Sequence, residues 1–94
     1  GDGPVSALDR ALRAALSWAY PEIADIHLTD YRVRDLDSSD GTSARVRVLC
    51  EHADIETAWG TVGVHENIID ASWKAVVEGL VIGLLRHVKR NGDD

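Results

Sequence analysis

The chain has no methionine, a single cysteine and no hydrophobic run long enough to cross a bilayer. A transmembrane helix needs about 20 consecutive apolar residues, so the sequence argues against a membrane partner. Cys50 has no second cysteine to pair with, which excludes an internal disulfide and favours a cytoplasmic location. Because a cytoplasmic chain normally starts with methionine and GDGP is typical of a turn, we expect these residues to be part of a longer polypeptide.

Positive charge is also scarce. Ten Lys and Arg stand against sixteen Asp and Glu, and the formal net charge of -6 argues against non-specific nucleic-acid binding. Hydrophobic residues make up 45% of the chain, which is ordinary for a globular domain and too many for a disordered one. The 94 residues suffice for one small domain with a modest core.

The start of the chain has the apolar spacing of an amphipathic helix, predicted over residues 5–20. Pro4 suits a first helical turn, where its missing N–H is not needed. Pro21 disfavours helical geometry in the residue before it, so the helix is expected to end near Tyr20.

A second helix is predicted over residues 67–89, with Asn67 as its N-cap and Lys89 and Arg90 at its C-terminal end. Apolar residues step along it by three and four: Ile69, Trp73, Val76, Val77, Leu80, Leu84 and Val88. A further apolar strip lies on another side of the helix: Ile68, Ala75 and Ile82. A helix that is apolar on two sides favours an oligomer or a neighbouring domain as its second partner.

Strand-forming residues fill three segments between the helices, 26–36, 44–51 and 56–64. SSDGTS at 38–43 contains an Asp-Gly pair, a strong hairpin signal. Alternation in the second strand places Val46, Val48 and Cys50 on one face, and Arg45, Arg47 and Leu49 on the other. The order α-β-β-β-α predicts an α+β fold in which an antiparallel sheet packs against helices on one face.

The two helix starts resemble each other in sequence. PVSALDRAL at 4–12 aligns with IIDASWKAV at 68–76. Each follows a glycine-containing turn, with Gly1 and Gly3 in one case and Gly60 and Gly63 in the other. The pattern indicates a duplicated unit: residues 1–20 supply the helix of a first unit, and residues 21–94 form a complete second βββα unit.

Several residue groups have two interpretations. Gly60 and Gly63 fit neither nucleotide-binding glycine pattern, which favours a tight strand-to-helix turn over a phosphate cradle. Cys50 and His52 share one side of a strand, but no second ligand pair stands at zinc spacing, which favours a buried thiol and surface histidines. A catalytic Cys-His or Ser-His-Asp set has no support beyond residue counts.

Arginines gather on the first two predicted strands, at Arg32, Arg34, Arg45 and Arg47. They can bind an anion or nucleic acid, or they can face solvent beside carboxylates. We favour the second interpretation because several aspartates are near in sequence: Asp30, Asp35, Asp37 and Asp40.

Four stretches carry a resemblance to a known family: GDGPVSALDRAL, LTDYRVR, DGTSARVRV and WGTVGVHENIIDASWKAV. In this order and spacing, residues 1–86 resemble the C-terminal regulatory domain of the 2-isopropylmalate synthases and citramalate synthases. The wording WGTVGV…NIIDASW is more similar to the citramalate-synthase branch.

The resemblance implies a duplicated βββα domain that forms a homodimer and binds leucine or isoleucine as a feedback inhibitor. The parent enzyme would condense acetyl-CoA with a 2-oxo acid on a TIM barrel that uses a divalent metal. This chain is then expected to have no catalytic residue, metal ligand or cofactor of its own. Its partners would be a second copy, the amino-acid effector and the parent's barrel.

The resemblance assigns these residues to the effector pocket: Gly1, Gly3, Val5, Ser6, Leu28, Asp30, Tyr31, Thr42, Ala44 and Val64. Glycines permit close approach of a backbone to an amino acid, and a helix N-terminus favours its carboxylate. Leu28, Tyr31 and Val64 are expected to enclose a branched aliphatic side chain. The chain departs from the family pattern at Asp2, Ser6 and His65.

Two other functions stay open from the sequence. One is a purely structural dimerisation module without effector binding. The other is a small independent enzyme, which the sequence favours least.

Overall fold

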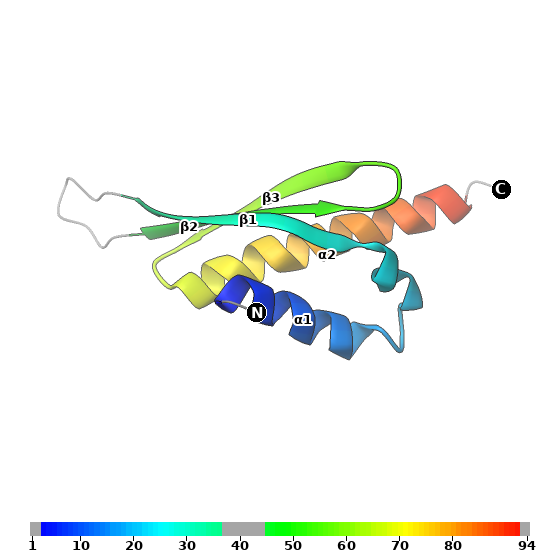
Figure 1. The fold of residues 1–94 in the computed structure, drawn as a ribbon, viewed down its shortest axis with the longest axis horizontal. Helices are drawn as coiled ribbons and strands as arrows, with labels where there is room; N and C mark the ends of the chain where they lie inside the picture. Colours follow the sequence, from blue (N-terminus) through cyan, green and yellow to red (C-terminus); the bar gives the residue numbers. More distant parts are fainter. Residues whose placement is uncertain (1–2, 37–44, 93–94) are drawn as a thin grey trace.

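The computed structural model describes residues 3–36 and 45–92, which form a three-stranded sheet and two α-helices (Figure 1). In chain order the elements are helix α1 (Pro4–Leu16), the short 3-10 helix η1 (Pro21–Asp25), strands β1 (His27–Leu36), β2 (Arg45–Ala53) and β3 (Ala58–His65), and helix α2 (Ile68–Gly92). This order confirms the predicted α+β class. The predicted turn at 38–43 lies outside the described residues.

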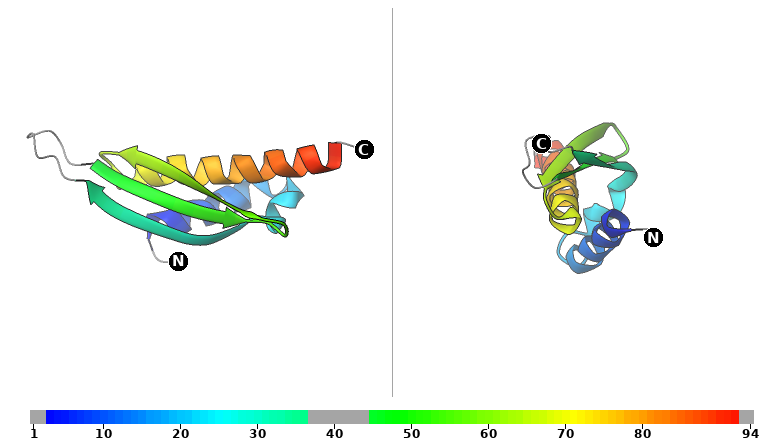
Figure 2. Two further views of the ribbon diagram at one scale, coloured as in Figure 1. Left: turned by 90° about the horizontal axis from the view of Figure 1, so that it is seen from above. Right: turned by 90° about the vertical axis from the view of Figure 1, so that its left-hand side faces the viewer.

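The strands are antiparallel in the order β1-β2-β3, and both helices lie on one face of the sheet (Figures 1 and 2). In β2 the predicted alternation is confirmed, since Val48 and Cys50 are buried whereas Arg47 and Leu49 are exposed. We call the side toward the helices the inner face and the opposite side the outer face.

The core lies between the inner face and the helices. Its buried hydrophobic residues are Val5, Ile23, Ile26, Val48, Cys50, Ala71, Ala75, Val76 and Leu80. Helix α1 supplies Val5, and the residues around η1 supply two isoleucines. Helix α2 supplies four of these residues and is the main cover of the sheet.

Helix α1 ends at Leu16, four residues before the predicted end. The N–H groups of Ala19 and Tyr20 both donate to the carbonyl of Leu16, at 3.1 and 2.8 Å, and this closes the last turn. The chain then enters η1, which the sequence did not predict. The early turn brings Ile23 into the core, where its burial favours the shorter helix.

Both helix starts lie at the aligned positions, Pro4 in α1 and Ile68 in α2. The predicted cap of α2 is confirmed, because the Asn67 side-chain oxygen accepts the N–H groups of Ile69 and Asp70 at 2.6 and 3.3 Å. Helix α1 has no side-chain cap and instead begins after Gly3, whose φ of 114° favours glycine. The duplication itself stays a prediction.

The predicted buried stripe of α2 is wrong in part. Val76 and Leu80 are buried as expected, but Ile69 and Trp73 are 49% and 50% exposed. The buried side is instead mostly small: Ala71, Ser72, Ala75, Val76, Gly79, Leu80 and Gly83. Gly63 on β3 explains this choice, because any Cβ there would overlap the carbonyl oxygen of Ala71. Large side chains do not fit where the backbones come this close.

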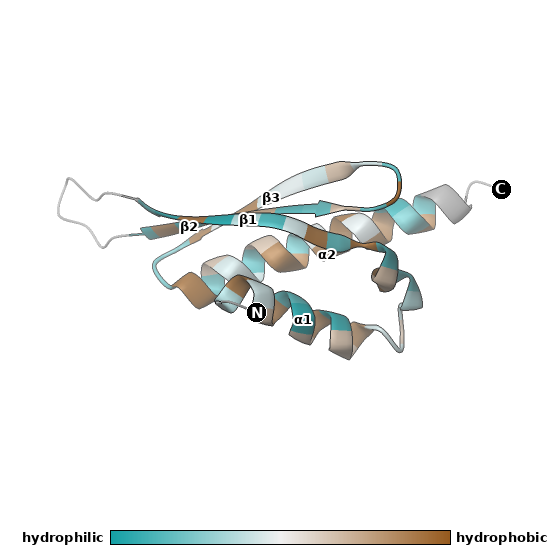
Figure 3. Ribbon diagram, viewed as in Figure 1, coloured by the Kyte–Doolittle hydropathy of each residue, from teal (hydrophilic) through white to brown (hydrophobic). Residues whose placement is uncertain are grey.

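Helix α2 therefore exposes a second apolar side, as predicted for a helix with two partners. We call it the α2 stripe, and its members are Ile69, Trp73, Val81, Leu85 and Val88. The predicted strip of Ile68, Ala75 and Ile82 is wrong, because Ala75 is buried in the core and the exposed side carries other residues. Hydrophobic residues occur along most of α2 in Figure 3. Within the part of the chain that the structure describes, no helix is long and apolar enough to cross a membrane.

The turn between β2 and β3 is fastened to the second half of α2. Arg86 donates to Asp54 at 3.1 Å, and its guanidinium lies 5.4 Å from the centre of the Trp59 ring. Trp59 in turn donates its indole N–H to the carbonyl of Gly79 at 2.9 Å. Burial would raise the pKa of Asp54, but Arg86 and the N–H groups of the turn lower that pKa to about 2.

Candidate functional site

A groove of about 450 Å³ opens between α1, η1 and the start of β1. We call it the α1–β1 groove, and its lining residues are Ser6, Asp9, Arg10, Arg13, Ala24, His27 and Leu28. Ser6, Arg10 and Arg13 recur at helical spacing on α1, so they share one side of it. Leu28 supplies an apolar wall from the sheet.

A polar cluster lies beside the groove, and two of its members, Asp9 and Arg13, line the groove. Asp9 accepts a hydrogen bond from Arg13 Nε at 2.8 Å, and its other oxygen lies 3.4 Å from His52 Nε2. Arg13 also donates to the carbonyl of Ile23 at 3.0 Å. The cluster thus ties α1 to both η1 and β2. Asp9 and His52 are buried, and a buried charge of this kind needs such partners.

The surroundings of the cluster change the pKa values of Asp9 and of the nearby Cys50. Burial alone would raise the pKa of Asp9, but hydrogen bonds to His52 and Arg13 outweigh it and lower that pKa. Asp9 is therefore an anion at neutral pH. Burial, and secondarily the Asp9 charge, raises the pKa of the Cys50 thiol to about 11.

One donor of the cluster lacks a partner. Arg13 Nη2 has no hydrogen bond within the described residues, although it is shielded from solvent. The other two nitrogens of the same guanidinium are bonded to Asp9 and Ile23. A small shift of Arg13 would let Nη2 meet an anionic group in the groove, because the residue itself lines it.

The structure brings together only some of the residues that the resemblance assigned to an effector pocket. Ser6 and Leu28 line the α1–β1 groove, and Gly3 stands at the start of the same helix. Val5 is fully buried in the core. Gly1, Thr42 and Ala44 lie outside the described residues.

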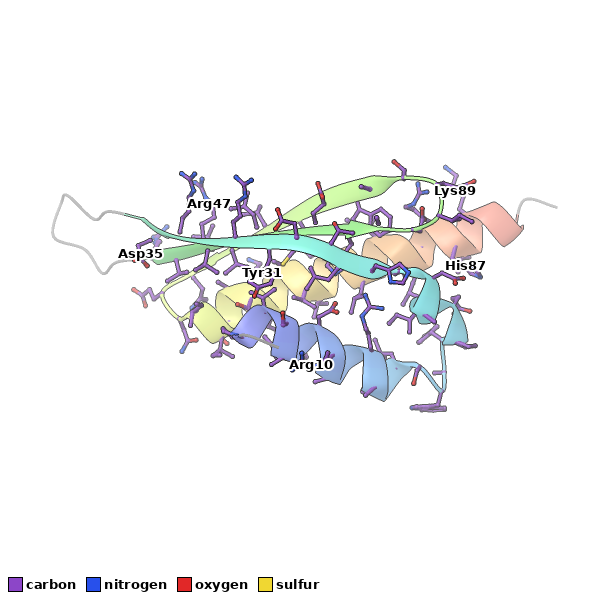
Figure 4. The ribbon with its side chains drawn as sticks, viewed as in Figure 1. Arg10, Tyr31, Asp35, Arg47, His87 and Lys89 are labelled. Atoms are coloured by element: carbon purple, nitrogen blue, oxygen red, sulfur yellow. The ribbon has the colours of Figure 1, made fainter. Side chains whose placement is uncertain are left out.

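The other assigned residues lie apart from the groove. Asp30 and Tyr31 line a hollow at the outer face, while Val64 lines another beside His65. The Tyr31 side chain itself points toward the helix layer and is partly buried against the core (Figure 4). Asp30 and Val64 face away from the helices, as their register with Glu51 and Arg47 shows.

Sequence reasoning missed the buried cluster and predicted surface histidines, which is wrong for His52. Two signals were present. His52 continues the buried alternation of Val48 and Cys50 in β2, and Asp9 and Arg13 are four residues apart on one helix. His52 is not at the surface because α2 packs directly against its side chain. The approach is so close that a Cβ at Gly79 would overlap the imidazole.

The structure also places the residues that the sequence analysis weighed as metal or anion ligands. Cys50 and His52 do share the inner face, but in the described ranges no three His, Cys, Asp or Glu side chains gather to hold a metal. The expected neutralisation of the arginines is seen for Arg32, which lies 3.9 Å from Asp30. Asp37 and Asp40 fall outside the described residues.

Comparison with known proteins shows the family of the chain. Residues 1–83 match the family described as LeuA allosteric (dimerisation) domain. The chain belongs to this family. The match is to an allosteric and dimerising domain and not to a catalytic one, which confirms the predicted regulatory relationship.

Relatives of this LeuA-type domain favour one branch of the family. A protein of Synechocystis sp., named (R)-citramalate synthase, is 61% identical over 84 residues, which are 89% of this chain and 15% of the relative. A protein of Aquifex aeolicus with the same name is 54% identical over 86 residues, 92% of this chain and 16% of the relative. One from Streptomyces coelicolor is 51% identical, again over 92% of this chain and 16% of the relative.

These identities confirm the predicted citramalate-synthase branch. The LeuA-type domain spans about 15% of the length of the curated relatives that it matches. No solved structure matches the chain.

Proposed function

We propose that this chain is the effector-sensing and dimerising part of a cytoplasmic (R)-citramalate synthase that condenses acetyl-CoA with a 2-oxo acid. Its effector is leucine or isoleucine, and the binding site is the α1–β1 groove. Catalysis, with its divalent metal, belongs to a TIM barrel elsewhere in the parent protein. The support is the family match together with relatives that carry this enzyme name over a small part of their length.

The groove carries the proposal because it offers a partner for each part of an α-amino acid. Arg10 and Arg13 are cations for the carboxylate, and Arg13 has an unused donor. Asp9 is an anion for the ammonium group. Leu28 and Ala24 supply apolar surface for an aliphatic side chain.

Regulation would follow from linkage. An effector in the groove contacts α1 on one side and β1 on the other, so it stabilises the arrangement in which these two elements lie together. Any activity in the parent that differs between arrangements of α1 then responds to the effector, by no more than its difference in affinity for the two states.

A second candidate is a structural dimerisation module without an effector. It is favoured by one observation: Asp30 and Val64 lie on the outer face, away from Ser6 and Leu28 in the groove. A single amino acid does not contact both places.

Titration calorimetry with leucine and with isoleucine separates the two functions. We expect heat with one of them, weaker binding with its D-enantiomer, and loss of most of the heat in Arg10→Ala. Lys74→Ala, which removes an exposed cation from α2, is the matched control and should bind as the unchanged chain does. A folded dimer that gives no heat with either amino acid at millimolar concentration, in this chain and in the full-length parent, would establish the structural module.

A further inference from the structure

The outer face of the sheet has an ordered distribution of charge. Three rows of cross-strand neighbours cross it, and they are Asp30–Glu51–Gly60, Arg32–Leu49–Val62 and Arg34–Arg47–Val64. One end is acidic, the middle is apolar on two strands, and the other end is basic. In Figure 4 Arg47 points away from the helices.

The basic end is unfavourable in an isolated chain. Arg34 and Arg47 lie directly opposite each other on neighbouring strands, and like charges in this position destabilise a sheet. Neither has an ion-pair partner among residues 3–36 and 45–92, whereas Arg32 has Asp30. At the acidic end Glu51 accepts a hydrogen bond from Thr29 at 3.2 Å but contacts no cation in the described part of the chain.

The middle row leaves apolar side chains in solvent. Leu49 is 38% exposed and Val62 is 46% exposed, with Val64 beside them. Next to this row the face is hollowed over about 410 Å³, at the place where Gly60 has no side chain to offer. A Cβ added at Gly60 would meet only the carbonyl oxygen of Cys50, at an ordinary 3.7 Å, so the fold does not require glycine here.

These rows are complementary to themselves. Arg47 and Glu51 stand two residues before and after Leu49, Arg34 and Asp30 stand likewise around Arg32, and Val64 and Gly60 around Val62. A twofold axis along the middle row places Arg34 and Arg47 over Asp30 and Glu51 of a second copy, and Arg32 over the same residue of that copy. It also places Val64 over the hollow at Gly60 of that copy.

We propose that two copies of this chain dimerise by packing their outer sheet faces together about this axis, with Leu49 and Val62 at the centre and Arg47 paired with Glu51 of the second copy. Such isologous contacts are the commonest way in which identical chains pair. Face-to-face sheets pack about 10 Å apart with an angle of about 30° between strands, which suits side chains of this size. Arg32 lies on the axis at the sheet edge, opposite Arg32 of the second copy, and there each arginine keeps its own Asp30 as partner.

The contact area is small. Eight residues at about 3.3 Å and three strands at about 4.8 Å give a face of roughly 26 by 14 Å. Interfaces at the low end of the size range form weak complexes, so we expect a dimer in the micromolar range for this chain alone. The inference rests on the dimerising part of the proposed function and is independent of effector binding.

Charge reversal tests the pairing. Arg47→Glu and Glu51→Arg each place like charges opposite one another twice per dimer, and each should weaken self-association at least about 50-fold in sedimentation equilibrium. A mixture of the two variants restores both opposite-charge contacts. It should form a heterodimer with an affinity within about 10-fold of the unchanged chain. Circular dichroism and the unfolding temperature of each variant confirm that the monomers are folded.

A second pair of variants separates this surface from the α2 stripe. Gly60→Leu fills the hollow and should abolish the dimer, whereas Trp73→Gln on the α2 stripe should leave it intact. If Trp73→Gln dissociates the dimer and the charge variants do not, the outer-face proposal is wrong and the dimerising function still stands. A chain that is monomeric at every concentration would overturn both.

Discussion

Helices α1 and α2 lie under the same sheet but are held there by different chemistry. Helix α2 comes so close to β3 that strand side chains bond to its backbone: Thr61 donates to the carbonyl of Ala75 at 2.7 Å, and Trp59 to that of Gly79. Helix α1 has no such backbone contact with the sheet among the described residues. It is tied to β2 by one buried pair, Asp9 and His52.

The difference teaches which helix can respond to a ligand. Close backbone approach depends on missing side chains and fixes α2 in one position, because packed interiors do not deform continuously. The charged contacts that hold α1 can exchange partners, since another anion or cation can take the place of Asp9 or Arg13. The α1–β1 groove opens beside these charged contacts, so an effector bound there would be able to change how α1 is held.

The largest expected effect is at the seat of α2. Gly63→Ala would overlap the backbone of Ala71, which no rotamer change can relieve, so we expect a loss of about 3 kcal/mol or more in the free energy of unfolding. Urea denaturation followed by circular dichroism measures it. Gly60→Ala is the matched control on the same strand, because a Cβ there makes only an ordinary contact of 3.7 Å with the carbonyl oxygen of Cys50, and it should change stability by under about 0.5 kcal/mol. Equal losses in the two variants would contradict the close-approach account.

The seat of α1 comes next. Asp9→Asn keeps the shape of the side chain but removes the charge that Arg13 and His52 share, which should destabilise the chain by about 2–3 kcal/mol. Hydrogen exchange should speed up in α1 before it does in α2. Asp25→Asn, at an exposed aspartate of η1, serves as control. An equal increase in the hydrogen-exchange rates of both helices would show that α1 and α2 are not held independently.

Capping distinguishes the helices at a smaller scale. Asn67→Ala removes the side-chain oxygen that accepts two N–H groups of α2 and should cost about 1 kcal/mol, whereas Asn67→Gly should cost only a few tenths. Differential scanning calorimetry resolves the two variants. If alanine and glycine are equally tolerated, the cap seen here does not stabilise α2.

The smallest expected effect concerns acid. The folded-state pKa of Asp54 is about 2, below its ordinary 3.8, so the Asp54–Arg86 contact stabilises the chain above pH 4 and is lost as pH falls from about 4 to about 2. Because Arg86 is a third exposed, solvent screening leaves under about 1 kcal/mol. The stability difference between the unchanged chain and Asp54→Asn should therefore shrink over that range. A difference that stays constant down to pH 2 would contradict the assignment.

Elements and their order were predictable from local signals. Asn67, the proline at the start of α1 and the alternation in β2 are each decided by neighbours in sequence. The orientation of α2 was not, because a helix that is apolar on two sides gives no rule for which side the sheet takes. Gly63 made that choice by admitting Ala71 and Ala75 and leaving Ile69 and Trp73 outside.

The candidate site was predicted less well than the fold. Ser6 and Leu28 were placed in one pocket and do line one groove. Asp9 and Arg13 also line it, and they meet the buried His52 from an element far away in sequence. That meeting depends on how α1 lies across the sheet. No local pattern encodes a contact over 43 positions.

Because Cys50 is buried, the rate at which its thiol is alkylated reports how often the helices separate from the sheet. The thiol is 3% exposed, and its pKa of about 11 keeps it in the unreactive protonated form near neutral pH. With no methionine and no other cysteine, it is also the only sulfur in the molecule. An alkylating reagent therefore modifies only those chains whose helices have lifted from the sheet, and each added mass counts one such event. A ligand that holds the helices against the sheet will therefore slow the alkylation of Cys50, and no added label is needed to detect it.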